Sequence, residues 1–321
     1  MALNHVGYPS STALYTVNRA CSSSLQAITS IADAIALGRI DAGIGAGMES
    51  MTRNYGSKAV PTVLWPELRK SPVKDAVDCI MSMGITSENV AERYGVSRID
   101  QDAFAKSSHR KAAKAESEGL FHAEIVPIKV GSAIESQLPI SRDDGIRHEL
   151  SMQTLGKLKP VFSDTGSSTA GNSSQISDGA AAALMMRRST AELLGLKKHI
   201  IGKWVGTKVI GVKPDEMGIG PAIAIPMLLD SVGLTAEEVG IWEINEAFAS
   251  QALYCIRKLG IDMEKVNPKG GAIAIGHPLG ATGARQLATL LPEMRRQGHE
   301  IGVISMCIGT GMGMSTLIVS E

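Results

Sequence analysis

Two cysteines and one histidine are the residues of this sequence best suited to nucleophilic chemistry. Cys21 follows a predicted strand and precedes a predicted helix. The free N–H groups and partial positive charge of a helix N-terminus favour a thiolate at such a position. Free cysteines are also common as small core residues, so Cys21 alone leaves a catalytic and a structural interpretation open.

A stronger pattern surrounds His277. Residues 270–283 read Gly-Gly-Ala-Ile-Ala-Ile-Gly-His-Pro-Leu-Gly-Ala-Thr-Gly. Glycines permit tight turns and the close approach of a ligand, and an imidazole held among them can take a proton from a thiol near neutral pH. The segment therefore predicts a general base beside a ligand, with a turn around a structural histidine as the alternative.

Three further segments carry polar groups next to predicted elements. Cys307 ends an apolar strand and enters a glycine-rich loop, whose backbone N–H groups can bind an oxyanion, although a tight hairpin would also use glycine. Asn245 lies between a predicted strand and helix, where its amide could cap the helix or hold a water or a carbonyl oxygen. The hydroxyl and amide groups of residues 169–174 offer similar alternatives, a helix cap or a ligand contact.

The composition excludes several classes of protein. The 321 residues contain 32 basic and 32 acidic side chains, which removes the excess of basic charge expected of a nucleic-acid or membrane-surface binder. The four cysteines are far apart and form no C-x-x-C pair, so neither a zinc site nor a disulfide framework is predicted. A basic helix near residues 106–114 is interpreted as a solvated face, with a phosphate site as the less favoured alternative.

The elements that would position these residues alternate between strands and helices, which predicts a layered α/β fold. Residues 52–160 are more charged and irregular, above all residues 131–150, and are interpreted as an insertion. A weak echo between the first and last parts of the chain suggests two similar halves. The predicted elements are a strand over 14–19, a helix over 25–37, a strand over 40–47, helices over 97–119, 177–188 and 221–232, a strand over 239–244, a helix after Asn245, a helix over 281–294 and a strand over 301–306.

Taken together, these motifs resemble those of the thiolase family, most closely the peroxisomal type of 3-ketoacyl-CoA thiolase. Residues 18–23 (Asn-Arg-Ala-Cys-Ser-Ser) are similar to the nucleophile motif. Residues 245–248 (Asn-Glu-Ala-Phe), 276–278 (Gly-His-Pro) and 307–309 (Cys-Ile-Gly) are similar to the other catalytic motifs. The resemblance extends over the whole chain. It implies catalytic roles for Cys21, Asn245, His277, Cys307 and Gly309, and substrate or CoA contacts for Met83, Ser174 and Phe248.

The resemblance also implies a fold. Two similar α/β halves would form an α-β-α-β-α core, the first half from residues 1–51 and 169–198 and the second from residues 199–321. Residues 52–168 would form the inserted loop domain that binds CoA. Family members carry a longer segment before the nucleophile, so the first half is expected to lack its first strand and helix here. Members form homodimers or dimers of dimers.

The reaction implied by the resemblance is thiolytic cleavage of a 3-ketoacyl-CoA in fatty-acid β-oxidation. Cys21 would attack the keto carbon with the help of His277, and Cys307 would protonate the departing acetyl-CoA enolate and later take the proton of the CoA thiol. One oxyanion site would use the backbone N–H groups of Cys21 and Gly309, and the other His277 with a water held by Asn245. CoA is a substrate, and no metal or tightly bound cofactor is implied.

Two alternatives to this function remain at the level of sequence. A biosynthetic acetoacetyl-CoA thiolase would share all four motifs, and a shortened, inactive thiolase-like protein would account for the brief segment before Cys21. The resemblance favours a peroxisomal location, with mitochondrial and cytosolic locations as alternatives. No targeting signal, membrane span or nucleic-acid partner is predicted.

Overall fold

Two β-sheets with helices between them form the body of the protein. The computed structural model describes residues 1–54, 63–129 and 139–321. One sheet pairs two antiparallel strands and the other has four strands in the order β3-β6-β5-β4. The strands are β1 (Ala42–Ser50), β2 (Asp178–Met186), β3 (Gly202–Gly211), β4 (Ile241–Ile244), β5 (Ile301–Ile308) and β6 (Met312–Ser320).

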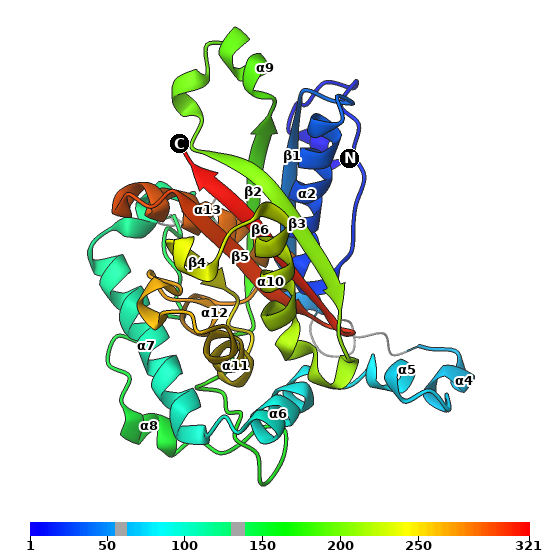
Figure 1. The fold of residues 1–321 in the computed structure, drawn as a ribbon, viewed down its shortest axis with the longest axis vertical. Coiled ribbons are helices and arrows are strands. Elements are labelled where there is room, and N and C mark those ends of the chain that lie inside the picture. Colours follow the sequence, from blue (N-terminus) through cyan, green and yellow to red (C-terminus); the bar gives the residue numbers. More distant parts are fainter. Residues whose placement is uncertain (55–62, 130–138) are drawn as a thin grey trace, which may run out of the picture.

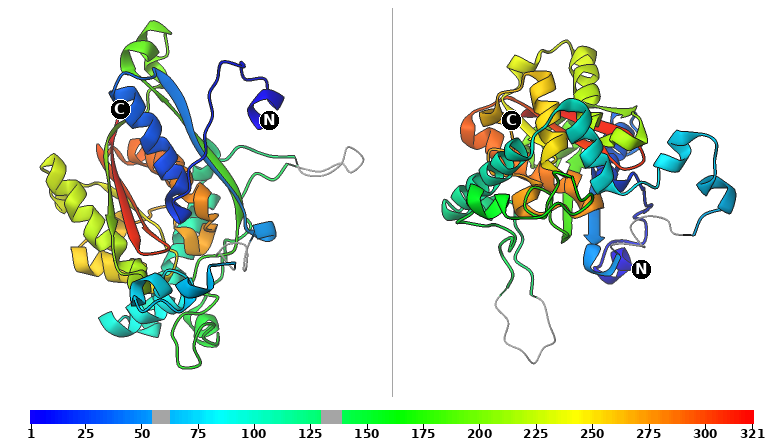
Figure 2. Two further views of the ribbon diagram at one scale, coloured as in Figure 1. Left: turned by 90° about the vertical axis from the view of Figure 1, so that its right-hand side faces the viewer. Right: turned by 90° about the horizontal axis from the view of Figure 1, so that it is seen from below.

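Helices α2 (Ser23–Ala36) and α13 (Thr282–Gln297) contact each other and lie between the two sheets (Figures 1 and 2). On the other side of the four-stranded sheet lie α10 (Gly220–Val232) and α11 (Ala249–Leu259). The described residues therefore form four successive layers, helix, sheet, helix and sheet. The layered α/β prediction is confirmed.

The two sheets differ in how much of their surface is buried. Strands β4 and β5 are buried almost throughout, as expected of strands covered by helices on both faces. In β1 and β2 burial alternates, so one face packs on α2 and α13 and the other is open to solvent. Exposed apolar side chains on these strands include Ile44, Met48 and Leu184.

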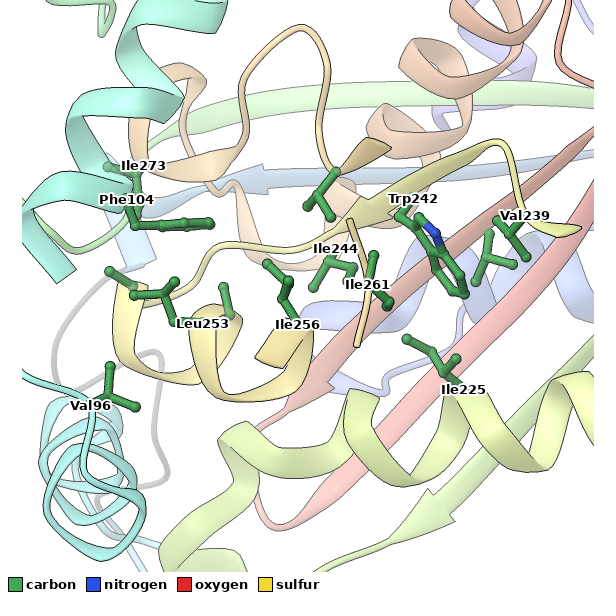
Figure 3. Packing of buried hydrophobic residues seen from close by; sticks show 14 of the residues in the cluster. Val96, Phe104, Ile225, Val239, Trp242, Ile244, Leu253, Ile256, Ile261 and Ile273 are labelled. Atoms are coloured by element: carbon green, nitrogen blue, oxygen red, sulfur yellow. The ribbon is translucent and has the colours of Figure 1, made fainter. Parts of the chain in front are cut away.

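The largest group of buried apolar side chains lies between the four-stranded sheet and its outer helices (Figure 3). Trp242 of β4 is the largest fully buried side chain, and it packs in this cluster with Ile225 of α10 and Ile256 of α11. Phe104 and Val96 join the cluster from the segment between the halves. This shared core fixes the insertion against the end of β4, where Asn245 follows.

The insertion supplies two long helices, α6 (Met83–Tyr94) and α7 (Arg98–Ser117). Helix α7 begins as predicted, with the Ser97 hydroxyl accepting a hydrogen bond from the Asp100 N–H at 3.2 Å. The sequence predicts an irregular segment over residues 131–150. Its first part, residues 131–138, lies outside the described residues. The shorter helices are α1 (Ala2–His5), α3 (Met51–Asn54), α4 (Pro66–Arg69), α5 (Lys74–Asp78), α8 (Met152–Gly156), α9 (Arg188–Leu193) and α12 (Ala272–Ile275). None of the described helices is long and apolar enough to cross a membrane.

Two of the predicted elements are wrong. Residues 14–19 form no strand, because no described strand pairs with them and their apolar side chains Leu14 and Tyr15 are exposed. Residues 177–188 form strand β2 and not a helix. Their run of alanines has a high helix propensity, but pairing with β1 along its whole length overrides it. Strands β3 and β6 were not predicted.

The contact between α2 and α13 depends on Gly283. A Cβ atom at this position would lie 2.5 Å from the Cβ and 2.7 Å from the backbone nitrogen of Leu25. We expect Gly283→Ala to lower the free energy of unfolding by about 1–3 kcal/mol, although alanine is the better helix former. Urea denaturation measures this change. Gly206→Ala in β3 is the control, because an added Cβ atom there would have no non-neighbouring atom of the described residues within 4 Å. An unchanged midpoint for Gly283→Ala would contradict the close approach.

Candidate functional site

Cys21 lies in the 3₁₀ turn η1 (Ala20–Ser22) that leads into α2. The turn contacts both β5 and the turn η8 (Leu279–Ala281), which follows His277. Ala20 has a φ of +43°, a left-handed conformation that costs free energy in a residue other than glycine, and its N–H donates to Asn18 Oδ1 at 2.9 Å. The hydrogen bond to Asn18 thus helps to hold Ala20 in its strained conformation, at the start of the turn that carries the Cys21 thiol.

The backbone N–H groups of Gly309 and of Cys21 itself favour the thiolate form of Cys21 and so act to lower its pKa. Burial has the larger effect and raises the pKa of Cys21 to about 11, opposed by the two N–H groups and reinforced by the charge of Glu49. The expectation that the helix N-terminus gives Cys21 a lowered pKa is therefore wrong. Cys21 is a neutral thiol at physiological pH.

Cys307 is the next-to-last residue of strand β5 and is buried. Burial raises its pKa well above the usual value of a thiol, and electrostatic interaction with Cys21 raises it further. Since η1 packs on β5, the two cysteines share one environment although they are almost the length of the chain apart. A thiolate at one cysteine makes ionisation of the other less favourable. Such a pair can therefore supply one thiolate nucleophile and one thiol that donates a proton.

His277 is the third member of the group, and it is buried beside Asn245. Asn245 Nδ2 lies 3.4 Å from Nε2 and 3.5 Å from Nδ1 of the imidazole. The Thr282 hydroxyl lies 2.7 Å from Nδ1 and fixes the orientation of the ring. Burial and the positive charge of Arg285 lower the pKa of His277 to about 3, so the ring is neutral at physiological pH.

Asn245 does not cap the helix that follows it. The residue at the N-cap of α11 is Phe248, so the helix-capping interpretation of Asn245 is wrong. Its Oδ1 atom is buried and has no hydrogen-bond partner among the described residues. A buried oxygen of this kind calls for a donor, such as a water, and Asn245 and His277 together can hold one.

Two of the predicted substrate-contact residues lie against Cys307. Met83, at the start of α6, and Phe248 belong to one apolar cluster with Cys307. Phe162 closes the cluster with its ring edge-on to Phe248, at 6.0 Å between centroids. Ser174 is held beside them, since its N–H donates to the Ala247 carbonyl at 3.0 Å. The structure therefore brings the predicted residues into one region, with apolar walls on the side of Cys307.

A cavity of about 340 Å³ adjoins the segment that carries Ser174. Its lining joins the insertion to the second half of the chain: His109, Arg147, Leu150, Thr154, Leu155, Leu158, Ala170, Gly171, Gln175 and Ile273. Most of these side chains are apolar, and Arg147 is an exposed cation at the rim. An apolar cavity with a cation suits a long ligand that ends in an anionic group.

The basic helix α7 fits the solvated interpretation only in part. Lys106, Arg110 and Lys114 are exposed, as expected of a solvated face. His109 is buried and accepts a hydrogen bond from the Arg147 N–H at 3.0 Å. Lys111 donates to two backbone carbonyls of the second half. The run of basic residues therefore does not form one phosphate-binding surface.

Sequence reasoning missed Thr282, Glu49 and Arg285. Thr282 orients His277, Glu49 accepts a hydrogen bond from the Gly280 N–H at 3.3 Å, and Arg285 affects the charge of the imidazole. Thr282 lies within the glycine-rich segment, five positions after His277, and a hydroxyl there was a usable signal. No sequence pattern connects Glu49 with this segment, because strand β1 brings it there.

The neutral thiol leads to a prediction about pH. With a pKa of about 11, only about one Cys21 in 10⁴ is ionised at pH 7, and the fraction rises about tenfold with each pH unit up to that value. Alkylation of Cys21 by iodoacetamide should therefore accelerate from pH 7 to pH 10 without a plateau. Mass spectrometry of the Cys21 peptide measures the rate. A plateau with a midpoint below about pH 8 would contradict the burial argument.

Comparison with known proteins agrees with this arrangement. Residues 1–189 match the model of the thiolase N-terminal domain, and residues 198–320 match that of the thiolase C-terminal domain. The peroxisomal 3-ketoacyl-CoA thiolase of Yarrowia lipolytica is 53% identical over 319 residues, which cover 98% of this chain and 76% of the relative. The peroxisomal 3-ketoacyl-CoA thiolase B of Mus musculus is 55% identical over 320 residues, 97% of this chain and 73% of the relative.

Solved structures of thiolases have the same fold as this chain. The dimeric peroxisomal thiolase of Saccharomyces cerevisiae superposes with a TM-score of 0.93 at 49% identity, covering 100% of this chain and 79% of the other. The acetyl-CoA acetyltransferase of Bacillus anthracis gives a TM-score of 0.88 at 36% identity, covering 100% of this chain and 82% of the other. With both domain models matched in order and the thiolase fold shared, the chain belongs to the thiolase family.

Proposed function

We propose that the protein cleaves a 3-ketoacyl-CoA with CoA, giving acetyl-CoA and an acyl-CoA two carbons shorter, as a thiolase of fatty-acid β-oxidation. The observation that carries the proposal is that the turn carrying Cys21 packs on two segments: strand β5, which carries Cys307, and the turn η8, which follows His277 with its imidazole beside Asn245. Relatives about half identical to this chain bear the name peroxisomal 3-ketoacyl-CoA thiolase, which supports the same substrate class.

In the first half-reaction the Cys21 sulfur attacks the 3-keto carbon. The thiol and the imidazole are both neutral, so the proton leaves Cys21 as the sulfur–carbon bond forms, and His277 is the base that receives it. The bond between carbons 2 and 3 then breaks. Its electron pair goes to carbon 2 of the leaving acetyl-CoA enolate, which takes a proton from the Cys307 thiol.

In the second half-reaction CoA attacks the acyl group on Cys21. The CoA thiol gives its proton to the Cys307 thiolate left by the first step, and the Cys21 sulfur departs and regains a proton from His277. Both cysteines end as thiols, so the cycle closes. Burial disfavours the Cys307 thiolate, which makes it a strong enough base to deprotonate CoA.

Each half-reaction develops a negative oxygen that needs donors. The N–H groups of Gly309 and Cys21, which favour negative charge on the sulfur, would stabilise the oxyanion on the carbon bonded to that sulfur. His277 and a water held by Asn245 would stabilise the enolate oxygen of acetyl-CoA. Such donors act most strongly where water is excluded, as in this buried site.

The cavity beside Ser174 is the proposed binding place of CoA. Its apolar lining suits the pantetheine arm and Arg147 a phosphate group. We further propose that the protein forms a homodimer, since the similar peroxisomal thiolase of Saccharomyces cerevisiae is dimeric. A peroxisomal location is proposed as well, because the relatives named above are peroxisomal thiolases.

The proposal is tested by following both product and intermediate. The purified protein is incubated with a long-chain 3-ketoacyl-CoA and CoA, and chromatography should show acetyl-CoA and the shortened acyl-CoA in equal amounts. Without CoA, mass spectrometry should find the acyl group on Cys21 alone. A folded protein that forms no acyl-Cys21 and no product would refute the proposal.

The second candidate is a biosynthetic acetoacetyl-CoA thiolase, favoured by the likeness to the acetyl-CoA acetyltransferase of Bacillus anthracis. The two functions share every step and differ in chain length. Cleavage of acetoacetyl-CoA only, with no turnover of substrates with eight or more acyl carbons, would support the biosynthetic function over the degradative one.

A further inference from the structure

Glu246 is a buried carboxylate that the reaction above does not use. It follows Asn245 directly and is only 2% exposed. Among the described residues, three donors surround it, and all are uncharged. The Ser108 hydroxyl donates to Oε2 at 2.6 Å, Asn267 Nδ2 donates to Oε1 at 2.7 Å, and the Ile273 N–H donates to Oε2 at 3.2 Å. A buried carboxylate without a directly paired cation is costly, so its retention calls for a reason.

The donors come from three segments that are distant in the chain. Ser108 lies in α7 of the insertion, Asn267 follows α11, and Ile273 lies in α12, four residues before His277. Ser108 also accepts a hydrogen bond from the Gly271 N–H at 3.0 Å. The carboxylate thus joins the insertion to the segment that ends in His277.

Asn267 connects the same carboxylate to the strand before Asn245. Its Oδ1 accepts from the Ile244 N–H at 2.9 Å and its Nδ2 donates to the Ile244 carbonyl at 2.8 Å. Both backbone polar groups of the last residue of β4 are therefore held by one side chain. Asn245 leaves the strand at this fixed point, and its direction is set by the same network.

There is no free space in this network. A Cβ atom at Gly271 would lie 2.2 Å from Cδ of Glu246, so the backbone of the segment before His277 rests directly on the carboxylate. A shift of the carboxylate would therefore be passed on to that backbone. Burial raises the pKa of Glu246, while the three hydrogen bonds and the charge of Lys111 lower it.

We propose that Glu246 is a positioning residue that sets the distance between Asn245 and His277, and so forms the second oxyanion site without touching the substrate. The Asn245 amide lies 3.4 Å from the imidazole, and the carboxylate is bonded to both of their segments, to that of Asn245 through Asn267 and to that of His277 through the Ile273 N–H. The inference rests on the proposed thiolase function and names a residue on which its chemistry depends.

The test is Glu246→Gln, which keeps the shape of the side chain but turns one acceptor oxygen into a donor that opposes its neighbours. We expect kcat to fall about 10²-fold, because the Asn245–His277 pair is misplaced by a fraction of an ångström, and KM to change much less than kcat, because Glu246 itself does not line the CoA cavity. In the background of Asn245→Ala, the same substitution should cost less than about threefold, since the site it positions is already lost.

Glu293→Gln is the matched control. Glu293 is also 2% exposed, and within the described ranges its carboxylate is bonded to Arg296 and Gln297 of the same helix, α13. It should leave kcat unchanged. Hydrogen exchange gives a readout that does not depend on activity: in Glu246→Gln, peptides covering 244–248 and 270–277 should exchange faster, and the β5–β6 peptides should not.

Each outcome decides one question. Unchanged kcat, a loss that is fully additive with Asn245→Ala, or exchange that rises throughout the protein would overturn the positioning role. If the wild-type protein shows no acyl transfer, the proposed function fails, and exchange alone decides whether Glu246 holds the two segments. If Glu246→Gln does not fold, Ser108→Ala, which removes one donor to the carboxylate and the acceptor of Gly271, takes its place with the same expected results.

Discussion

Replacing Cys21 with serine is expected to lower kcat at least about 10³-fold, to the limit of detection. The thiol is already difficult to ionise in this site, with a pKa of about 11, and an alcohol is more difficult still. The imidazole that must take the proton has a pKa of about 3 and is a weak base for such a task. Product formation from 3-ketoacyl-CoA and acyl labelling of the protein should vanish together.

The control for this experiment is Cys79→Ser. Cys79 is half-buried like Cys21, but its sulfur is hydrogen-bonded to the carbonyls of Asp75 and Thr310. Its replacement should leave kcat and acyl labelling unchanged. Acylation that persists in Cys21→Ser, or that moves to Cys307, would show that the nucleophile has been assigned to the wrong sulfur.

Replacing His277 with alanine is expected to lower kcat about 10²–10³-fold, the usual cost of losing one oxyanion donor, with a further loss from the missing base. Acyl-Cys21 should form slowly and still be detectable, because the Gly309 and Cys21 N–H groups remain in place. Stopped-flow measurement of each half-reaction separates the two effects.

Two measurements control the His277 prediction. His199 is exposed in the turn before β3, and its replacement by alanine should not change kcat. Alkylation of Cys21 at pH 10 should also be nearly unchanged in His277→Ala, because hydroxide and not the imidazole then removes the proton. A His277→Ala protein that keeps more than a tenth of wild-type kcat would exclude the role given to the imidazole.

Much of the site could be predicted from sequence because its residues lie in short, distinctive segments. His277 stands in a segment unusually rich in glycine, and Cys307 stands where an apolar strand meets a glycine-rich loop. These local patterns identified the candidate residues, and the resemblance to thiolases predicted that they take part in the same reaction. The structure brings them together through α2, β5 and the turn η8.

What the sequence could not supply depends on neighbours that are distant in the chain. The pKa of Cys21 is raised by burial under other segments, whereas the sequence displays only the helix that follows it. The alanine run of β2 resembles a helix until β1 is present to pair with it. Glu246 looks like an ordinary member of a short motif, and its three donors come from positions 108, 267 and 273.

The burial of Lys269 has a chemical consequence for a protein that handles thioesters. A thioester that acylates a cysteine also acylates an accessible free amine, and this lysine stands one residue before the glycine-rich segment. Its side chain is only 1% exposed, its ammonium group is ion-paired with Glu124 at 2.5 Å, and it lies over the ring of Phe121. The amine that is nearest to His277 in the chain is thus shielded from damage by the protein's own substrate.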